Sequence, residues 1–300
     1  MIEINIQGRL GNQMFQYAFA RSLQEKKGGE AINLCFIHDA DSLKNFHTKY
    51  HTYNTLHPSI LQKNIIIIFH LAKKILKIDY RNRWKEHLFE LKYQRILNFF
   101  GIYWLTQGYY DFPIRNFKNT ILVGHFESSK YFEAIKEQLI EEFTPKHPLV
   151  KTNFDLYEKI KSSESVCIAI RRGDYVNNEH VKKNSLICTV NYFKKAIKIM
   201  QEKISNPVFF VFSDDIEFVK NNMGFESNSF IYENGNNPVW ETMKLMYSCK
   251  HFIISNSTFH WWAQYLSRNE DKIVIAPSRW RNYKCKLDIY EPNWILVEPD

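Results

Sequence analysis

The chain has 300 residues, of which 45% are hydrophobic and 16% aromatic, so it can bury a large core and is long enough for two domains. No segment is long and apolar enough to cross a bilayer, and five scattered cysteines without a CxxC pair argue against a zinc site or a disulfide framework. The formal charge of +8 fits an anionic substrate, an anionic membrane surface or an ordinary lysine-rich surface, and nucleic acid ranks last because no nucleic-acid module signature is present.

Short apolar strands alternate with amphipathic helices in the first half, which is typical of an α/β architecture. The predicted strands are residues 2–6, 31–37, 102–106 and 121–125, and the predicted helices are residues 12–26, 59–76 and 128–142. The chain begins like a strand and carries no secretion signal, so we expect a cytoplasmic protein or the catalytic part of an anchored parent.

The predicted helix over residues 59–76 has two interpretations. We favour a core or domain-packing helix, because its apolar residues cover too much of the circumference for a clean amphipathic helix. The alternative is an interfacial helix that rests on a membrane and turns its lysines toward lipid phosphates.

A segment with two prolines, residues 143–148, follows the last of these helices. Prolines interrupt helices and mark connections, so we take this segment as the crossing between an N-terminal domain, 1–145, and a C-terminal domain, 146–300.

The second half repeats the α/β rhythm. The predicted strands are residues 166–170, 207–212, 230–232, 251–254 and 272–276, and the predicted helices are residues 191–203, 216–223, 240–249 and 258–266. Three of these strands end in polar residues at a turn. In an open parallel sheet, ligands bind outside the carboxyl ends of the strands, so we expect the functional site there.

Arg171 and Arg172 directly follow the first of these three strands. Guanidinium groups are always charged and grip two phosphate oxygens at once, so the pair predicts an anion site. Gly173 allows a tight turn, and Asp174 either holds an arginine or contacts the acceptor. A salt-bridged strand end is the plainer alternative.

The other two strand ends carry Asp214 with Asp215, and Ser257 with Thr258. A carboxylate there binds a ribose hydroxyl or guanine N–H groups, with a metal site or a helix cap as competitors. The two hydroxyls and the first-turn amides of the following helix favour a diphosphate, with a plain N-cap as the alternative. We expect no metal, because the arginines already supply positive charge and the Asp-x-Asp pattern at residues 39–41 is a weak signal.

Three segments resemble the signature segments of the α-1,2-fucosyltransferases, glycosyltransferase family 11. They read GRLGNQMFQYA at residues 8–18, IRRGDY at 170–175 and SNSTFHWW at 255–262, and their order and spacing fit across nearly the whole chain. The resemblance implies two facing Rossmann-like domains of the GT-B type. It also implies GDP-L-fucose as the donor substrate, an inverting reaction, and no metal or other cofactor.

The resemblance assigns roles by position. It puts Arg171 on the β-phosphate with Arg172 in support, Asp215 or Asp214 on the guanosine, and the first segment at the fucose. The donor-binding set is Gly11, Asn12, Gln13, Arg171, Arg172, Asp214, Asp215, Asn256, Ser257, Thr258 and Phe259. Two residues depart from the family: many relatives have His where Ala169 stands, and a small serine is common where His260 stands.

The predicted reaction moves L-fucose from GDP-β-L-fucose to the 2-hydroxyl of a galactose-type residue in a glycan. Arg171 stabilises the leaving diphosphate, and the general base is Asp174, Glu179 or His180. The C-terminal domain carries the donor and the N-terminal domain is acceptor-side. The expected acceptor is a β-galactoside-containing glycan, such as a lipid-linked O-antigen, with peripheral contact to the inner membrane. The rivals are a transferase of the same fold with another nucleotide sugar or linkage, and a glycan- or nucleotide-binding protein without turnover.

Overall fold

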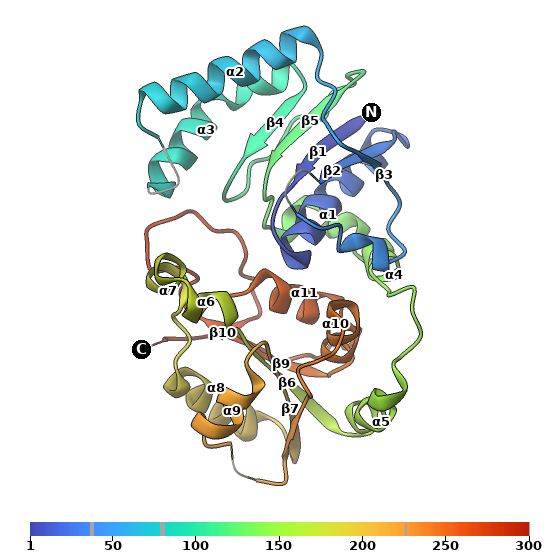
Figure 1. Cartoon of the computed structure of the whole chain (residues 1–300), viewed down its shortest axis with the longest axis vertical. Coiled ribbons are helices and arrows are strands. Elements are labelled where there is room, and N and C mark those ends of the chain that lie inside the picture. The colour runs from blue at the N-terminus through green and yellow to red at the C-terminus, as the bar shows by residue number, and fades with distance from the viewer. Residues whose placement is uncertain (37–38, 79–81, 226, 300) are drawn as a thin grey trace. The chain divides into compact units, whose positions relative to one another are not determined.

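The computed structural model describes residues 1–36, 39–78, 82–225 and 227–299, and the side chains of Asp174 and His180 lie outside this description. The chain forms two compact units, each built on a parallel sheet with helices packed against it (Figure 1). The first unit is Met1–Phe143 with Lys284–Tyr290, and the second is Thr144–Tyr283 with Glu291–Asp300. The predicted α/β architecture is confirmed in both.

The first unit has a five-stranded parallel sheet of order β3-β2-β1-β5-β4. Its strands are β1 (Ile2–Ile6), β2 (Ile32–Phe36), β3 (His51–Tyr53), β4 (Ile102–Leu105) and β5 (Thr120–Gly124). Its helices are α1 (Leu10–Lys26), α2 (Ile60–Ile75), α3 (Arg83–Phe99) and α4 (Lys136–Glu142), with short 3-10 turns at Leu43–Asn45, Ser129–Tyr131 and Glu133–Ile135. The four predicted strands lie within two residues of the observed bounds, except that Ile37 falls outside the described residues.

The predicted helix over residues 128–142 is wrong in its first half, where the chain forms two 3-10 turns and α4 begins only at Lys136. Tyr131 and Phe132 are both buried, and they contact Phe19 and Phe15 of α1 respectively. Both side chains therefore pack against α1 from this pair of 3-10 turns.

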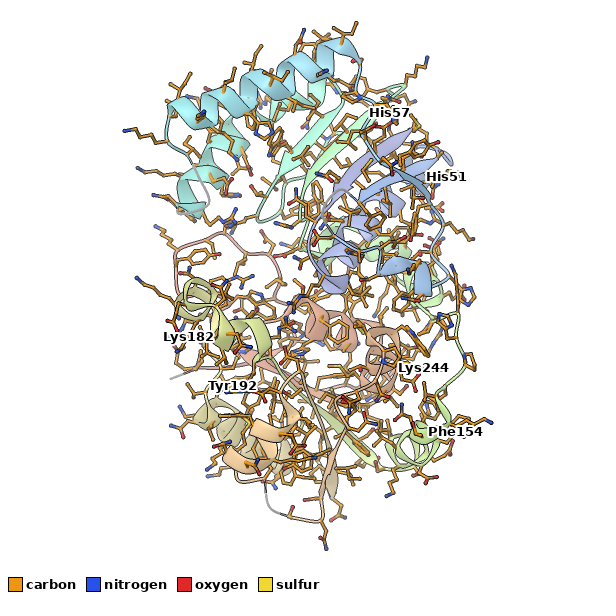
Figure 2. The ribbon with its side chains drawn as sticks, in the orientation of Figure 1. His51, His57, Phe154, Lys182, Tyr192 and Lys244 are labelled. Carbon is orange, nitrogen blue, oxygen red and sulfur yellow. The ribbon has the colours of Figure 1, made fainter. Side chains whose placement is uncertain are left out.

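The second unit has a six-stranded parallel sheet of order β11-β10-β9-β6-β7-β8. Its strands are β6 (Glu164–Ile170), β7 (Pro207–Ser213), β8 (Phe230–Tyr232), β9 (His251–Ile254), β10 (Val274–Pro277) and β11 (Ile295–Val297). Its helices are α5 (Phe154–Ser162), α6 (Gly173–Asn177), α7 (Glu179–Ser185), α8 (Val190–Lys203), α9 (Ile216–Asn222), α10 (Val239–Tyr247) and α11 (Thr258–Leu266), with a 3-10 turn at Lys151–Asn153. Tyr192 of α8, which Figure 2 labels, donates from its hydroxyl to the carbonyl of Ile254 at 2.6 Å and so ties α8 to the end of β9.

The segment Lys284–Tyr290 belongs to the first unit, although the predicted division at residue 145 placed it in the C-terminal domain. Asp288 explains this return. Its Oδ2 accepts from the backbone N–H of Tyr109 at 2.9 Å, and its Oδ1 lies 3.1 Å from Lys130 Nζ. No local pattern marks the segment, because its partners lie far away in the sequence.

A buried ion cluster joins α2 to α3. Lys73 Nζ lies 2.6 Å from Glu86 Oε1 and 3.0 Å from Glu90 Oε1. Both carboxylates are buried, and Glu90 also accepts from the backbone N–H of Thr106 at 2.8 Å. Burial raises the pKa of Glu90, against the lowering effect of Lys73 and Thr106. Lys73 therefore compensates for the negative charge of these buried carboxylates.

Replacing Lys73 by methionine is expected to destabilise the protein by about 3 kcal/mol, because it leaves the buried carboxylate of Glu90 without the cation that pairs with it. Glu86 keeps a second ion pair, with Arg83 Nη1 at 2.8 Å. Lys74→Met is the matched control: its side chain is exposed, and we expect a change within about 0.5 kcal/mol. Urea unfolding of both variants measures the difference. Equal stability of the two would show that Lys73 does not compensate for the buried carboxylates.

Candidate active site

Three neighbouring strands of the second sheet end side by side. In the parallel register, Ile170 of β6 is opposite Ser213 of β7, and Ala169 is opposite Ile254 of β9. The residues that follow these ends therefore meet at one edge of the sheet, where parallel sheets bind ligands. Arg171, Asp214 and Ser255 open the three connecting segments.

Asp214 holds both arginines at this edge. Its Oδ2 lies 2.8 Å from Arg171 Nη1, and its Oδ1 accepts from the backbone N–H of Arg172 at 2.8 Å. Gly173 makes room for this carboxylate, since a Cβ there would stand 2.5 Å from Asp214 Oδ2. A charge-assisted bond of this kind fixes the direction of a guanidinium group.

Arg172 is fixed separately. Its Nε lies 3.1 Å from Asp215 Oδ2, and its guanidinium carbon lies 3.2 Å from the ring centre of Phe218. Asp215 also caps α9, because its Oδ1 accepts from the backbone N–H of Phe218 at 3.4 Å. Asp215 therefore caps α9, as the alternative interpretation predicted, and also forms an ion pair with Arg172.

A buried histidine lies beneath Arg171. The hydroxyl of Ser255 accepts from the backbone N–H of Arg171 at 3.1 Å and lies 2.9 Å from Nδ1 of His260. Burial, and then the charge of Arg171, lower the pKa of His260 to about 3. His260 is therefore neutral at pH 7, and through Ser255 it supports the backbone that carries Arg171. The sequence showed His260 only as a departure from the family.

Asn256 acts inside the protein. Its Nδ2 donates to the backbone carbonyls of Ser185 at 2.8 Å and Trp280 at 3.0 Å. Its backbone carbonyl accepts from the hydroxyl of Tyr175 at 2.8 Å. Both amide hydrogens are thus engaged within the second unit, so Asn256 positions the segment before α11. Ser185 and Trp280 are site-supporting residues that no sequence pattern marked, whereas Tyr175 lies in the IRRGDY segment.

The segment between β9 and α11 carries the expected hydroxyl groups. Ser257 is buried and lies at the N-terminus of α11, yet in the described part of the chain its side chain accepts no capping hydrogen bond. Thr258 and Phe259 are half-buried in the first turn. Ser257 therefore holds the N-cap position of α11 without a capping bond to its side chain from any described residue. The N–H groups at a helix start favour negative charge.

Of the three candidate general bases, the structure describes the side chain of Glu179 alone. Asp174 lies in α6, but its side chain is outside the description, as is that of His180 in α7. Glu179 begins α7 with its side chain 89% exposed, and its carboxylate lies 3.5 Å from Nζ of Lys182, which Figure 2 labels. Such an exposed pair is weak, and it leaves the Glu179 carboxylate in contact with water.

In the first unit, the loop from Gly8 to Gln13 is tightly built. Gly8 has φ of +81°, a conformation that favours glycine, and a Cβ there would stand 2.6 Å from Asn12 Nδ2. Gln13 is buried, donates to the carbonyls of Gly8 and Ala40 at 2.9 Å each, and accepts from the N–H of Ser42 at 3.0 Å. Gly11 is buried in the first turn of α1. Gln13 therefore fixes the loop that presents Asn12.

The two carboxylates of the Asp-x-Asp pattern are both hydrogen-bonded. Asp39 accepts from the N–H of Gly8 in this loop at 2.8 Å, whereas Asp41 accepts from the hydroxyl of Tyr50 at 2.8 Å. Across the described residues, no three His, Cys, Asp or Glu side chains gather in an arrangement that would hold a metal ion.

The neutral state of His260 predicts how stability depends on pH. Below the ordinary histidine pKa of 6.5, the unfolded chain takes up a proton that the folded state refuses until about pH 3, so stability falls as pH drops through this window. Between pH 7.5 and 5 this costs on the order of 1–2 kcal/mol.

His260→Ser is expected to remove that part of the pH dependence, measured as unfolding free energies at pH 7.5 and 5. His147→Gln, at an exposed histidine of the same unit, is the matched control and should keep the wild-type dependence. An unchanged pH dependence in His260→Ser would mean that His260 titrates normally in the folded state.

Comparison with known proteins shows which family this chain resembles over its length. The model of the family described as glycosyl transferase family 11 matches residues 1–298. O-antigen biosynthesis glycosyltransferase WbnK of Escherichia coli is 30% identical over 310 residues, which cover 97% of this chain and 98% of the relative. An α-1,2-colitosyltransferase of Escherichia coli is 30% identical over 315 residues, covering 99% of each. Galactoside α-(1,2)-fucosyltransferase 1 of Saimiri boliviensis boliviensis is 24% identical over 308 residues, covering 98% of this chain and 74% of the relative.

Among solved structures, a mutant of FUT1 from Arabidopsis thaliana in complex with GDP matches with a TM-score of 0.51 and 12% identity, covering 93% of this chain and 70% of that chain. At this identity the likeness concerns the fold. The predicted pair of Rossmann-like domains of the GT-B type is confirmed. With a parallel sheet in each unit and the family model matching nearly every residue, the chain belongs to glycosyl transferase family 11.

Proposed function

We propose that the chain transfers L-fucose from GDP-β-L-fucose to the 2-hydroxyl of a galactose-type residue in a glycan, with inversion to an α-1,2 linkage. The observation that carries this proposal is the pair of arginines held by Asp214 at the carboxyl edge of the second sheet. The names of the relatives supply the linkage and the sugar class: two act through α-1,2 bonds, and one of these is a galactoside fucosyltransferase.

Arg171 is assigned to the β-phosphate of the donor. As the bond between the anomeric carbon and the phosphate oxygen breaks, the electron pair and its charge pass to GDP, and a fixed guanidinium stabilises that charge. Ser257, Thr258 and Phe259 are assigned to the diphosphate, where the first-turn N–H groups of α11 add positive potential. Arg172 supports Arg171, and Asn256 supports α11.

Asp214 and Asp215 take different parts in this proposal. Asp214 is engaged with both arginines, so it acts on the donor through them. Asp215, which pairs with Arg172 and caps α9, is the residue we assign to the guanosine. Gly11, Asn12 and Gln13 are assigned to the fucose, with Gln13 positioning the loop by its three hydrogen bonds.

The acceptor hydroxyl attacks the anomeric carbon from the face opposite GDP, and its proton passes to one general base. The candidates for this base are the carboxylates of Asp174 and Glu179 and the imidazole of His180. The exposed position of Glu179 keeps it accessible to a large glycan. We assign the acceptor to the N-terminal domain, and a lipid-linked O-antigen glycan fits the name of one bacterial relative.

Colitose is the strongest rival donor sugar, because an equally similar relative is a colitosyltransferase. It differs from fucose in lacking one hydroxyl. A site that hydrogen-bonds this hydroxyl rejects the deoxy sugar strongly, whereas an apolar slot does not. The two donors therefore have to be compared directly in one assay.

The test is release of GDP from GDP-L-fucose in the presence of EDTA, with lactose or another β-galactoside as the acceptor. We expect acceptor-dependent turnover that falls by about a hundredfold or more in Arg171→Ala. Arg268→Ala is the matched control, because it removes an exposed arginine of the same unit that follows the C-terminus of α11 and not the carboxyl end of a strand. Turnover with GDP-colitose alone would replace the donor, loss on adding EDTA would reveal a metal, and full activity of Arg171→Ala would remove the phosphate assignment.

A second test addresses Asp214 through its neighbour. Gly173→Ala places a methyl group against the Asp214 carboxylate, so the arginines lose their alignment and GDP binds about tenfold more weakly. In an Asp214→Ala background the same change meets no carboxylate and should have no further effect on the dissociation constant, measured by titration calorimetry. Additive losses in the double variant would show that Gly173 acts by another route.

A further inference from the structure

Helix α2 exposes a row of aliphatic side chains. Ile60, Leu61, Ile67, Ile68, Leu71 and Ile75 are all exposed, at 83% for Ile60, 65% for Ile68 and 77% for Ile75. Spacings of seven, four and four residues put Ile60, Ile67, Leu71 and Ile75 on one side of a helix. A row of large exposed aliphatic side chains is uncommon on a protein surface that only meets water.

The opposite side of α2 already anchors the helix. Phe69 is buried against Phe89 of α3 and Trp104 of β4, with ring centres 5.1 and 4.8 Å apart. Gln62 donates to the carbonyls of Phe100 and Asn119, and Lys73 closes the ion cluster with α3. Figure 1 shows α2 running along α3. The exposed row is therefore not needed to hold α2 in the first unit.

The charges around this row have one sign. In the described part of residues 59–99, every charged side chain that is exposed is basic, namely Lys63, Lys74, Lys77, Lys85, Lys92 and Arg95. The two acidic residues described there, Glu86 and Glu90, are buried with Lys73. Lys63 and Lys74 follow Ile60 and Leu71 by three residues and so flank the aliphatic row.

We propose that α2 is a membrane-docking helix that lies in the surface of a bilayer of anionic phospholipids. Its aliphatic row enters the boundary between headgroups and acyl chains, and the flanking lysines meet lipid phosphates. The helix has 16 residues and is about 24 Å long, and among the described helices none is long and apolar enough to span a membrane. The helix therefore lies in the interface plane.

The same charges argue against a second copy as the occupant. A two-fold contact would place this patch against itself, with like charges facing each other. The cores of protein interfaces are also depleted of lysine. This inference goes beyond the proposed function, since α2 carries no residue assigned to the donor or the acceptor.

The experiment is co-sedimentation of the whole chain with vesicles of phosphatidylglycerol and phosphatidylcholine, or of phosphatidylcholine alone. We expect the anionic vesicles to bind at least about tenfold more strongly, with binding that weakens as salt rises. Combined Ile67→Gln, Ile68→Gln and Leu71→Gln should lower binding about tenfold at unchanged melting temperature, because these side chains are exposed. Val239→Gln with Leu296→Gln, at exposed aliphatic positions of the second unit, is the matched control.

Charge is tested with Lys63→Gln and Lys74→Gln, which should weaken binding to the anionic vesicles and remove much of the salt dependence. Lys198→Gln with Lys203→Gln, at exposed lysines of α8, is the control and should leave binding unchanged. The proposal is overturned if the wild type binds neither vesicle, if the triple variant binds as well as wild type, or if the wild type is a dimer that the triple variant converts to a monomer without any vesicle binding.

Discussion

The candidate site depends on one carboxylate, that of Asp214. Arginines at the end of a parallel strand would point in many directions if they were held only by their own flexible chains, and an anion site needs them fixed. The Asp214 carboxylate bonds the guanidinium of Arg171 and the backbone N–H of Arg172. The absence of a side chain at Gly173 leaves room for that carboxylate. Beneath them, Ser255 and a neutral His260 hold the backbone of Arg171.

Much of the fold follows from patterns that act over short distances. The strands that form β1, β4, β6 and β9 are short apolar runs bounded by turn residues, and α2 begins at a capping box between Ser59 and Gln62, so local chemistry marks their position. Because the α/β rhythm predicts a parallel sheet, the sequence alone places the three polar segments at one sheet edge. The resemblance to the family then gave these segments chemical roles.

The rest depends on partners that are distant in sequence. The sequence did not predict β3, because this strand is exposed and only three residues long and so has no hydrophobic alternation. It did not predict α3 either, because the buried side of that helix includes polar residues such as Glu90, Gln94 and Asn98. Lys284–Tyr290 joins the first unit through Asp288. The hydrogen bonds of Asn256 to Ser185 and Trp280 could not be predicted either, because these residues are distant in the sequence. The same holds for the support of Arg171 by His260 through Ser255.

The position of GDP in a crystal structure of this chain with the nucleotide bound tests the donor assignment most directly. We expect the β-phosphate at the guanidinium of Arg171, with Asp214 still bonded to the backbone N–H of Arg172 and the diphosphate near the first turn of α11. Density for the diphosphate elsewhere, for example only at the loop from Gly8 to Gln13, would contradict the assignment of the donor to the edge of the second sheet.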